Sequence, residues 1–460
     1  MIPKRVMGVE TEYGLTTATT TGAPSSLTPE DAAQRLFKRI VEWGRSTNTF
    51  LTNGSRLYLD VGAHPEFASA ECDSIADLVA MDRAGDLIFQ SMVDEANRGL
   101  EAEDMPERIH LIKNNVDSAG NSFGCHENYL IRRRRDFRAR VDSLVPFFIT
   151  RQVLTGAGHI RKQPGGAVYE ISQRADQMWD AISSASTRSR PIVNTRDEPH
   201  GDIEKYRRMH VIVGDSNMSQ TSTALKFATT EMLLVMIEDG VIMPDLKLQD
   251  PMRSIREISH DVSLKTTVEL ENGRMRTALQ IQREFAEAAH NHYERQGYFA
   301  DLDDTRSAMV TLWIEALDRL EEGDLDSLST KLDWIAKHNI LERYRTKGGL
   351  TWDDPRLTRL EFAYHDLSPA AGLATSMEKQ GLLESVVTEE AVHHAIDNPP
   401  ATTRAALRGR FVGAASEARR DFMVDWMNLR LLEADGARTV ILKDPFSPVD
   451  ERVDELLEQV

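Results

Sequence analysis

The sequence predicts an α+β fold, with a mostly antiparallel sheet flanked by helices and a small domain at the C-terminal end. Short segments of alternating apolar and polar residues gather in the first half of the chain, as strands do. After about residue 222 the apolar residues follow helical spacing instead. The stretch NPPATT (398–403) then marks a break before the last segment. We therefore expect a large domain over residues 1–385 and a small one over residues 386–460.

The first elements can be placed from the residues at their ends. RVMGVETEYG (5–14) alternates and predicts a strand. A helix is expected over 28–44, because Thr28 suits the N-cap, Pro29 the first helical position and Asp31 a capping box. The further elements are, in chain order, a strand at SRLYLDV (55–61), a helix capped by Ser74, strands at 109–115, 126–133 and 207–217, several long helices, and a final helix and short strand at VILKDPF (440–446).

The composition limits the class of protein. The 460 residues include 55 basic and 73 acidic ones, which gives a formal net charge of −18. So much acid argues against general nucleic-acid binding, because phosphate backbones attract basic surfaces. The two cysteines, Cys72 and Cys125, are too few for a disulfide framework or a thiolate metal cage. No signal peptide and no apolar run of about 20 residues occurs, so we expect a soluble cytoplasmic protein with no membrane span.

Two of the expected strands carry polar residues on one face. Residues two apart in a strand point to the same side. Glu10 and Glu12 therefore share a face of the first strand. Arg56, Tyr58 and Asp60 project together from the second strand. The intervening apolar residues should face the core, and they are Leu57, Leu59 and Val61.

If the two strands lie in one sheet, their polar faces form one acidic floor, and Glu66 can close its edge. Mg²⁺ prefers hard oxygen ligands and often takes only a few carboxylates. Arg56 beside such a floor suits phosphate, through its planar fork of donors. We interpret the face as a nucleotide–metal platform. The alternative is a solvated face with surface ion pairs, each worth about 0–1 kcal/mol.

A second polar group is basic and lies in the segments 187–200 and 204–217. Clustered cations near an acidic floor would bind phosphates or a carboxylate substrate. The alternative is simple compensation of the nearby acids. Two of these cations, Arg208 and His210, share one strand face. The whole group is Arg188, Arg190, Arg196, Arg207, Arg208 and His210.

Three other features allow more than one interpretation. The polar loop KNNVDSAGNSFGCHENYL (113–130) suits either a ligand contact or a surface connection. The basic run within IRRRRDFRAR (131–140) suits a solvated face, an RNA-binding patch or an acidic protein partner. Trp426 is most simply a core residue of the small domain. No glycine-rich phosphate loop is present, so a bound ATP would lie on the sheet.

Several long motifs resemble the Pup ligase family, also called proteasome accessory factor A, which belongs with the carboxylate–amine ligases related to glutamine synthetase. The resemblance runs from residue 4 to about residue 450. The motifs are MGVETEYG, NGSRLYLDVGAHPE, ASAECD, KNNVDSAGNSFGCHENYL, TRQVLTGAG, SSASTRSRPIVNTRDEPH, YRRMHVIVGDSNMS, YHDL, PPATTRAALRG and VDWM.

The resemblance implies a glutamine synthetase-like sheet domain with a small C-terminal domain packed on it. It also implies an ATP- and Mg²⁺-dependent ligase. The enzyme would phosphorylate the side-chain carboxylate of the C-terminal glutamate of Pup, a small disordered acidic modifier. A lysine of a target protein would then attack, which marks the target for the bacterial proteasome. The lysine ammonium, with a pKa of about 10.4, must first lose a proton.

Residue by residue, the resemblance implies specific roles. The expected catalytic base is Asp60. Ser69 stands where the family has threonine, and its hydroxyl is kept. The expected magnesium ligands are Glu10, Tyr58 and Glu66; the expected ATP contacts are Arg56, Ser69 and Trp426; and the residues expected to line the same site are Glu12, Arg207, Arg208 and His210.

Three alternatives stay open. The sister enzyme, a Pup deamidase and depupylase, carries a long loop before the NG-ARLY strand, whereas only about ten residues separate the first helix from Arg56. The strand also continues YLDVGAHPE, which is the ligase form. A small-molecule glutamate–cysteine-type ligase would not explain the specific motifs. A non-catalytic Pup-binding module would not need Glu10, Tyr58, Asp60 and Glu66 together.

Overall fold

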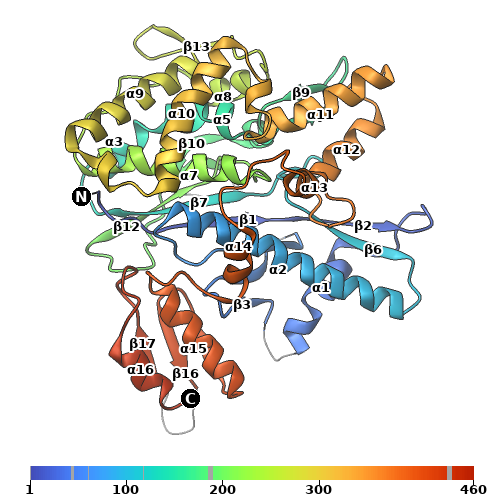
Figure 1. The fold of residues 1–460 in the computed structure, drawn as a ribbon, viewed down its shortest axis with the longest axis vertical. Helices are drawn as coiled ribbons and strands as arrows, with labels where there is room; N and C mark the ends of the chain where they lie inside the picture. Colours follow the sequence, from blue (N-terminus) through green and yellow to red (C-terminus); the bar gives the residue numbers. More distant parts are fainter. Residues whose placement is uncertain (1, 43–45, 61, 118, 185–189, 433–437) are drawn as a thin grey trace.

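The computed structural model describes residues 2–42, 46–60, 62–117, 119–184, 190–432 and 438–460. Within them the chain forms one large sheet, four smaller ones and several layers of helices (Figure 1). Neighbouring strands of the large sheet are antiparallel, apart from one parallel pair at an edge. The predicted α+β class with a mostly antiparallel sheet is confirmed.

The large sheet has eight strands in the described part of the chain. The strand at the start of the sequence lies near its middle, so residues from distant segments meet on both sides of it. In spatial order the strands are β10 (Asp180–Ser183), β11 (Pro191–Asn194), β12 (Tyr206–Val211), β7 (Cys125–Arg132), β1 (Met7–Glu12), β5 (His64–Ala68), β4 (Arg56–Asp60) and β3 (Asn48–Phe50).

Helices cover one face of this sheet and leave the other open. The helices α2 (Ile75–Ala102) and α7 (Gln220–Glu238) pack directly on β1 and β7. Helix α7 is buried along most of its length, because α9 and α10 cover it from outside (Figure 1). The other helices of this part are α3 (Phe137–Asp142), α4 (Val145–Thr150), α5 (Gln152–Thr155), α8 (Pro251–Ser259), α9 (Ala278–Gln296), α10 (Asp304–Glu322), α11 (Asp333–Gly348), α12 (Pro355–His365) and α13 (Leu373–Lys379).

The first two helices begin where their caps predict. In α1 (Pro29–Glu42) the Thr28 hydroxyl accepts from the backbone N–H of Asp31, and the Asp31 carboxylate accepts from the backbone N–H of Thr28. Ser74 accepts from the backbone N–H three residues on and starts α2. Two-stranded sheets complete the periphery: β2 (Gly14–Thr19) with β6 (Glu107–Ile112), β8 (His159–Arg161) with β9 (Val168–Glu170), and β13 (Thr267–Glu269) with β14 (Met275–Thr277).

A small domain lies at one end of the large sheet (lower part of Figure 1). It has its own apolar cluster, built from residues between Leu407 and Leu456. Helix α14 (Glu389–Asp397), which precedes it, packs on α2 instead. The expected boundary at residue 386 stays a prediction. The elements of the small domain are α15 (Ala405–Glu417), β15 (Phe422–Val424), β16 (Asn428–Leu431), β17 (Arg438–Ile441) and α16 (Glu451–Leu457).

The structure differs from the expected elements mainly at β5. No strand was expected there, yet β5 lies between β1 and β4. The strand expected at 109–115 begins and ends earlier, as β6, and the one expected at 207–217 ends at Val211. Leu57 is buried and Leu59 is partly buried as expected, whereas Val61 lies outside the described residues. None of the described helices is both long and apolar enough to cross a membrane.

Candidate functional site

The open face of the sheet brings the predicted acidic residues together. The register places Glu12 opposite Glu66, and Glu66 opposite Tyr58, in one row across β1, β5 and β4. A second row joins Glu10 to Arg56 through Ala68. Glu66 was expected to close the edge of this floor, but that expectation is wrong. It lies in the middle, because β5 carries it between β1 and β4.

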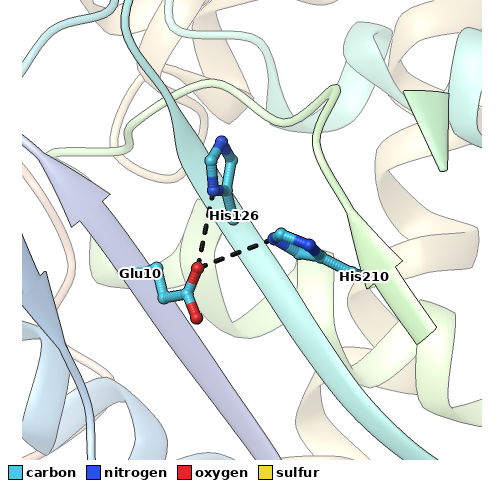
Figure 2. A group of neighbouring side chains, drawn as sticks. All are labelled: Glu10, His126 and His210. Atoms are coloured by element: carbon cyan, nitrogen blue, oxygen red, sulfur yellow. Dashed lines mark ion pairs between the residues drawn. The ribbon is translucent and has the colours of Figure 1, made fainter. Parts of the chain in front are cut away.

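Glu10 lies beside His126 of β7 and His210 of β12 (Figure 2), and Arg208 of β12 is a third basic neighbour. Its carboxylate is 3.5 Å from His126 Nδ1, 3.6 Å from His210 Nε2 and 3.7 Å from Arg208 Nη1. The two imidazoles also contact each other edge to face, with ring centres 5.0 Å apart. Burial would raise the pKa of Glu10, but the neighbouring His126 and His210 and the charge of Arg208 hold it well below its ordinary value. Glu10 is therefore ionised.

A second group on the same face consists of three carboxylates. One oxygen each of Glu12, Asp60 and Glu66 lies within 4.8 Å of the others. Burial, and then the charges of Glu10 and Glu12, raise the pKa of Glu66 well above its ordinary value. Tyr58 lies opposite Glu66 on the neighbouring strand, and its own pKa is raised by burial and then by the charges of Glu10 and Glu66. Like charges held this close favour a bound cation.

A pocket adjoins this acidic face where the small domain meets the sheet. Glu10 lines the pocket and so belongs to both regions. Gly8 shares the face of Glu10, and a Cβ there would lie 3.3 Å from Ser69 Oγ, so glycine keeps the floor open. The aromatic and basic walls suit a purine base and phosphates. Residues that line the pocket include Gly8, Ser69, His200, Arg208, Arg404 and Trp426.

Two of the three expected ATP contacts line this pocket, namely Ser69 and Trp426. The Ser69 hydroxyl accepts from the backbone N–H of Val9 at 3.0 Å, which holds it in place. Trp426 contacts Phe50 edge to face, at 5.0 Å between ring centres, and does not belong to the apolar cluster of the small domain. Its interpretation as a core residue is wrong.

Arg56, the third expected ATP contact, lies outside the pocket on the outer side of the acidic face. Its guanidinium lies 4.4 Å from the centre of the Tyr58 ring and donates from Nε to Asn48 Oδ1 at 2.7 Å. Within the described residues the outer nitrogens of the guanidinium have no hydrogen-bond partner, so they could bind a phosphate. The acidic face thus has a cation at each end, Arg56 on one side and Arg208 on the other.

The basic group divides between the two faces. Arg208 and His210 reach the site, whereas Arg207 points to the covered face. There it lies over the Phe137 ring and pairs with Asp197 at 2.8 Å, so its expected place in the site is wrong. Strand alternation explains the difference, because Arg207 is on the side of the buried residues of β12. Of the other cations, Arg190 donates to Gln177 and Ser122, Arg196 lies 3.5 Å from Glu198, and Arg188 is outside the described residues.

The basic run 132–135 is partly neutralised by the chain itself. Arg133 pairs with Asp197 at 2.8 Å, and Arg134 pairs with Asp136 at 2.9 Å. Arg132 and Arg135 are exposed, and neither has an ion pair within the described part of the chain. Only these two arginines of the run can offer an unpaired charge to a partner.

Sequence reasoning missed His126 and Asn128 as site residues. They alternate with Glu127 and Tyr129, which are buried on the covered face. A strand with polar residues on both faces gives no sign of which face is open. A buried strand face normally shows apolar residues at every second position. Glu127 breaks that pattern, because its buried charge is paired with Arg151.

The fold and the site define a class: an α+β protein with an open acidic face on an antiparallel sheet and a ligand pocket beside it. The Pup-ligase protein family matches residues 5–430. The chain is 52% identical to the Pup–protein ligase of Xylanimonas cellulosilytica, over 99% of this chain and all of the relative. It is 51% identical to that of Sanguibacter keddieii over the full length of both. The chain therefore belongs to the Pup ligase family.

Two solved structures agree with this relationship. The crystal structure of the ligase PafA in complex with the ubiquitin-like protein Pup matches with a TM-score of 0.92 and 41% identity, over 99% of this chain and 92% of that one. A Pup ligase PafA in complex with ADP matches with a TM-score of 0.84 and 42% identity, over 95% and 94%.

Proposed function

We propose that this protein is an ATP-dependent Pup–protein ligase. It joins the side-chain carboxylate of the C-terminal glutamate of Pup to lysines of target proteins, through a γ-glutamyl phosphate. The observation that carries the proposal is the contact between the acidic face and the pocket, which share Glu10. A phosphate of a nucleotide held in the pocket would lie over the carboxylates. The full-length relationship to Pup–protein ligases supports the choice of substrate.

Magnesium fits the donors of the acidic face. Glu10, Tyr58 and Glu66 are the proposed ligands, and Glu12 offers a further carboxylate in the row of Glu66 and Tyr58. All of these donors are hard oxygens, and the raised pKa of Glu66 indicates a site that needs positive charge. A bound Mg²⁺ would neutralise charge on the transferring phosphate. Arg56 and Arg208 would hold phosphate oxygens from the two ends of the face.

Asp60 is the proposed base for the incoming lysine. It is exposed at the end of β4, next to the carboxylates that would hold the metal. A lysine that approaches from solvent therefore meets Asp60 at the rim of the site. Transfer of the ammonium proton to a carboxylate leaves a neutral amine, which can attack an acyl phosphate.

Other features of the chain bear on the location of the enzyme, its small domain and its attraction of Pup. A cytoplasmic location fits the two cysteines, which are both buried and unbridged. We propose residues 386–460 as the small C-terminal domain, with Trp426 as its contribution to the pocket. Arg132 and Arg135 would attract acidic Pup by long-range steering.

A conjugation assay tests the proposal. Pup ending in glutamate, a lysine-bearing target, ATP and Mg²⁺ are combined, and conjugate and ADP are followed together. A conjugate that forms in step with ADP is the expected result. Release of target from a preformed conjugate, without stoichiometric ATP use, would identify a depupylase instead. Pup binding without turnover of ATP would identify a binding module.

A further inference from the structure

A buried ion cluster joins the small domain to the sheet beside the pocket. Glu71 follows β5, Arg404 precedes α15, and Arg408 lies in the first turns of α15. Their exposed fractions are 8%, 2% and 0%. Glu71 Oε1 accepts from Arg404 Nε at 2.9 Å and from Arg408 Nη1 at 3.1 Å, and Arg408 Nη2 contacts Oε2. Burial would raise the pKa of Glu71, but Arg408 and Arg404 lower it to about 2, so the carboxylate is ionised.

Arg408 connects this cluster to the aromatic wall of the pocket. Its Nη1 donates to the backbone carbonyl of Trp426 at 3.1 Å, and its Nε donates to that of Gly54 at 3.0 Å. Its guanidinium lies 5.0 Å from the centre of the Trp426 ring and 5.3 Å from that of Phe50. Arg408 therefore fixes Trp426 at its main chain and at its ring.

The cluster also leaves positive charge at the pocket. Two guanidiniums share the single carboxylate of Glu71, and Arg404 and Glu71 both line the pocket. Arg404 further donates to the backbone carbonyl of Leu442 at 2.8 Å, which ties the small domain to the same point. An anionic ligand in the pocket would balance the remaining charge and strengthen this junction.

We propose that Glu71 is a positioning residue for nucleotide binding. Its carboxylate orients Arg404 and Arg408 and, through Arg408, holds Trp426 against the pocket. The inference rests on the proposed nucleotide pocket. Since Glu71 and Trp426 come from different domains, nucleotide binding and docking of the small domain stabilise each other.

The test uses Glu71→Gln, which keeps the shape of the side chain and removes its negative charge. The KM for ATP and the Kd for ADP are expected to rise about tenfold or more, while kcat at saturating ATP changes far less. The matched control is Glu238→Gln, which breaks a buried ion pair with Arg5 on the covered side. That control should lower thermal stability and leave the KM for ATP unchanged. Equal changes in KM for both variants would reduce Glu71 to a structural role.

A double-mutant cycle separates this inference from the pocket itself. Trp426→Ala should weaken ADP binding, and Glu71→Gln should add little in that background, because both changes remove the same contact. No effect of Trp426→Ala would show that the pocket is misplaced. Additive effects would show that Glu71 acts independently of Trp426 and would overturn the positioning role.

A measurement on the unaltered protein covers the case that Glu71→Gln does not fold. Saturating ADP should slow hydrogen exchange in the first turns of α15 and at Gly54, which the cluster joins. The distant β13–β14 hairpin should not change. Unaltered exchange in α15 on ADP binding would contradict the coupling.

Discussion

The two faces of the large sheet use carboxylates in opposite ways. On the covered face Glu127 accepts from Arg151 Nη1 at 2.8 Å and from the Tyr129 hydroxyl at 2.6 Å, and all three side chains are buried. On the open face the nearest basic atom to Glu10 is 3.5 Å away. Asp60 and Glu66 have no ion pair within the described residues.

The difference separates structural from functional acids. A buried carboxylate with short, direct partners stabilises the fold at that point, and removal of either partner is costly. A group of carboxylates without such partners raises the energy of the folded chain unless a cation binds. Partner distance is therefore the property on which the proposed ligand role of the open face rests. The following substitutions and one pH series test this contrast, from the largest expected effect to the smallest.

Asp60→Asn should have the largest effect. Loss of the proposed base should slow ligation by about 10²–10⁴-fold, while ADP affinity stays unchanged. Single-turnover conjugation and ADP titration measure the two quantities. Ligation at the normal rate in this variant would remove Asp60 from the chemistry.

Glu127→Gln tests the covered face. Arg151 would remain buried without its counter-charge, so the free energy of unfolding should fall by about 3–5 kcal/mol. Urea denaturation measures this loss. The Mg²⁺ concentration for half-maximal ATP turnover should stay the same, and a shift in it would break the contrast between the faces.

The contribution of Glu71 to the free energy of unfolding should depend on pH. Its pKa falls from an ordinary value of 4.5 to about 2 in the folded protein. A depressed carboxylate pKa stabilises the fold above the unfolded value and loses that effect as pH falls through the folded value. The difference in unfolding free energy between wild type and Glu71→Gln should be roughly 3 kcal/mol near neutral pH, at about 1.4 kcal/mol per pKa unit. It should shrink from about pH 5 towards pH 2; a constant difference would contradict the ionised cluster.

Glu66→Gln tests the open face with the same two measurements as Glu127→Gln, and the opposite results are expected. The Mg²⁺ concentration for half-maximal ATP turnover should rise about tenfold or more, because a proposed ligand is lost. Glu10→Ala should act in the same direction. The free energy of unfolding should not fall in Glu66→Gln, since one of several like charges is removed. A normal Mg²⁺ titration together with lost stability would make Glu66 a structural residue.

Reversal of Arg132 and Arg135 to glutamate should have the smallest effect. Both are exposed, so a change in Pup association of a few-fold is expected, and it should disappear at high salt. The association rate measured at two ionic strengths tests this. Arg134→Glu is not a clean comparison, because Arg134 already pairs with Asp136.

Local signals in the sequence predicted much of the fold, as the starts of α1 and α2 show. Strand β5 was missed because Pro65 argues against a central strand. The structure explains the exception: Pro65 lies opposite Tyr13, just past the end of β1, where its carbonyl accepts from the Tyr13 N–H at 2.9 Å and His64 Nδ1 donates to the Tyr13 carbonyl at 3.1 Å in place of the absent N–H. The alternating residues of β1 and β4 correctly predicted that their acidic side chains lie on one face of the sheet. A pattern with a period of two residues depends only on neighbours along the chain, so it can be recognised in the sequence.

The walls of the pocket could not be predicted in this way. Glu71 and Arg408 are 337 positions apart, and their contact depends on how the small domain docks. The faces of Arg207 and Glu127 were also hidden, because each charge is matched by a partner from another element. Pairing of this kind is a property of tertiary structure, which no local pattern records.

The wide span of the pocket along the chain has a consequence for synthesis of the protein. Its walls include Val6 and Pro445, so they come from segments 439 positions apart that leave the ribosome at different times. At about 5–20 residues per second, the two are made roughly 20 to 90 seconds apart. A nascent chain can form the acidic strands long before it can close the pocket. The proposed nucleotide pocket therefore cannot form until the segment around Pro445 has left the ribosome.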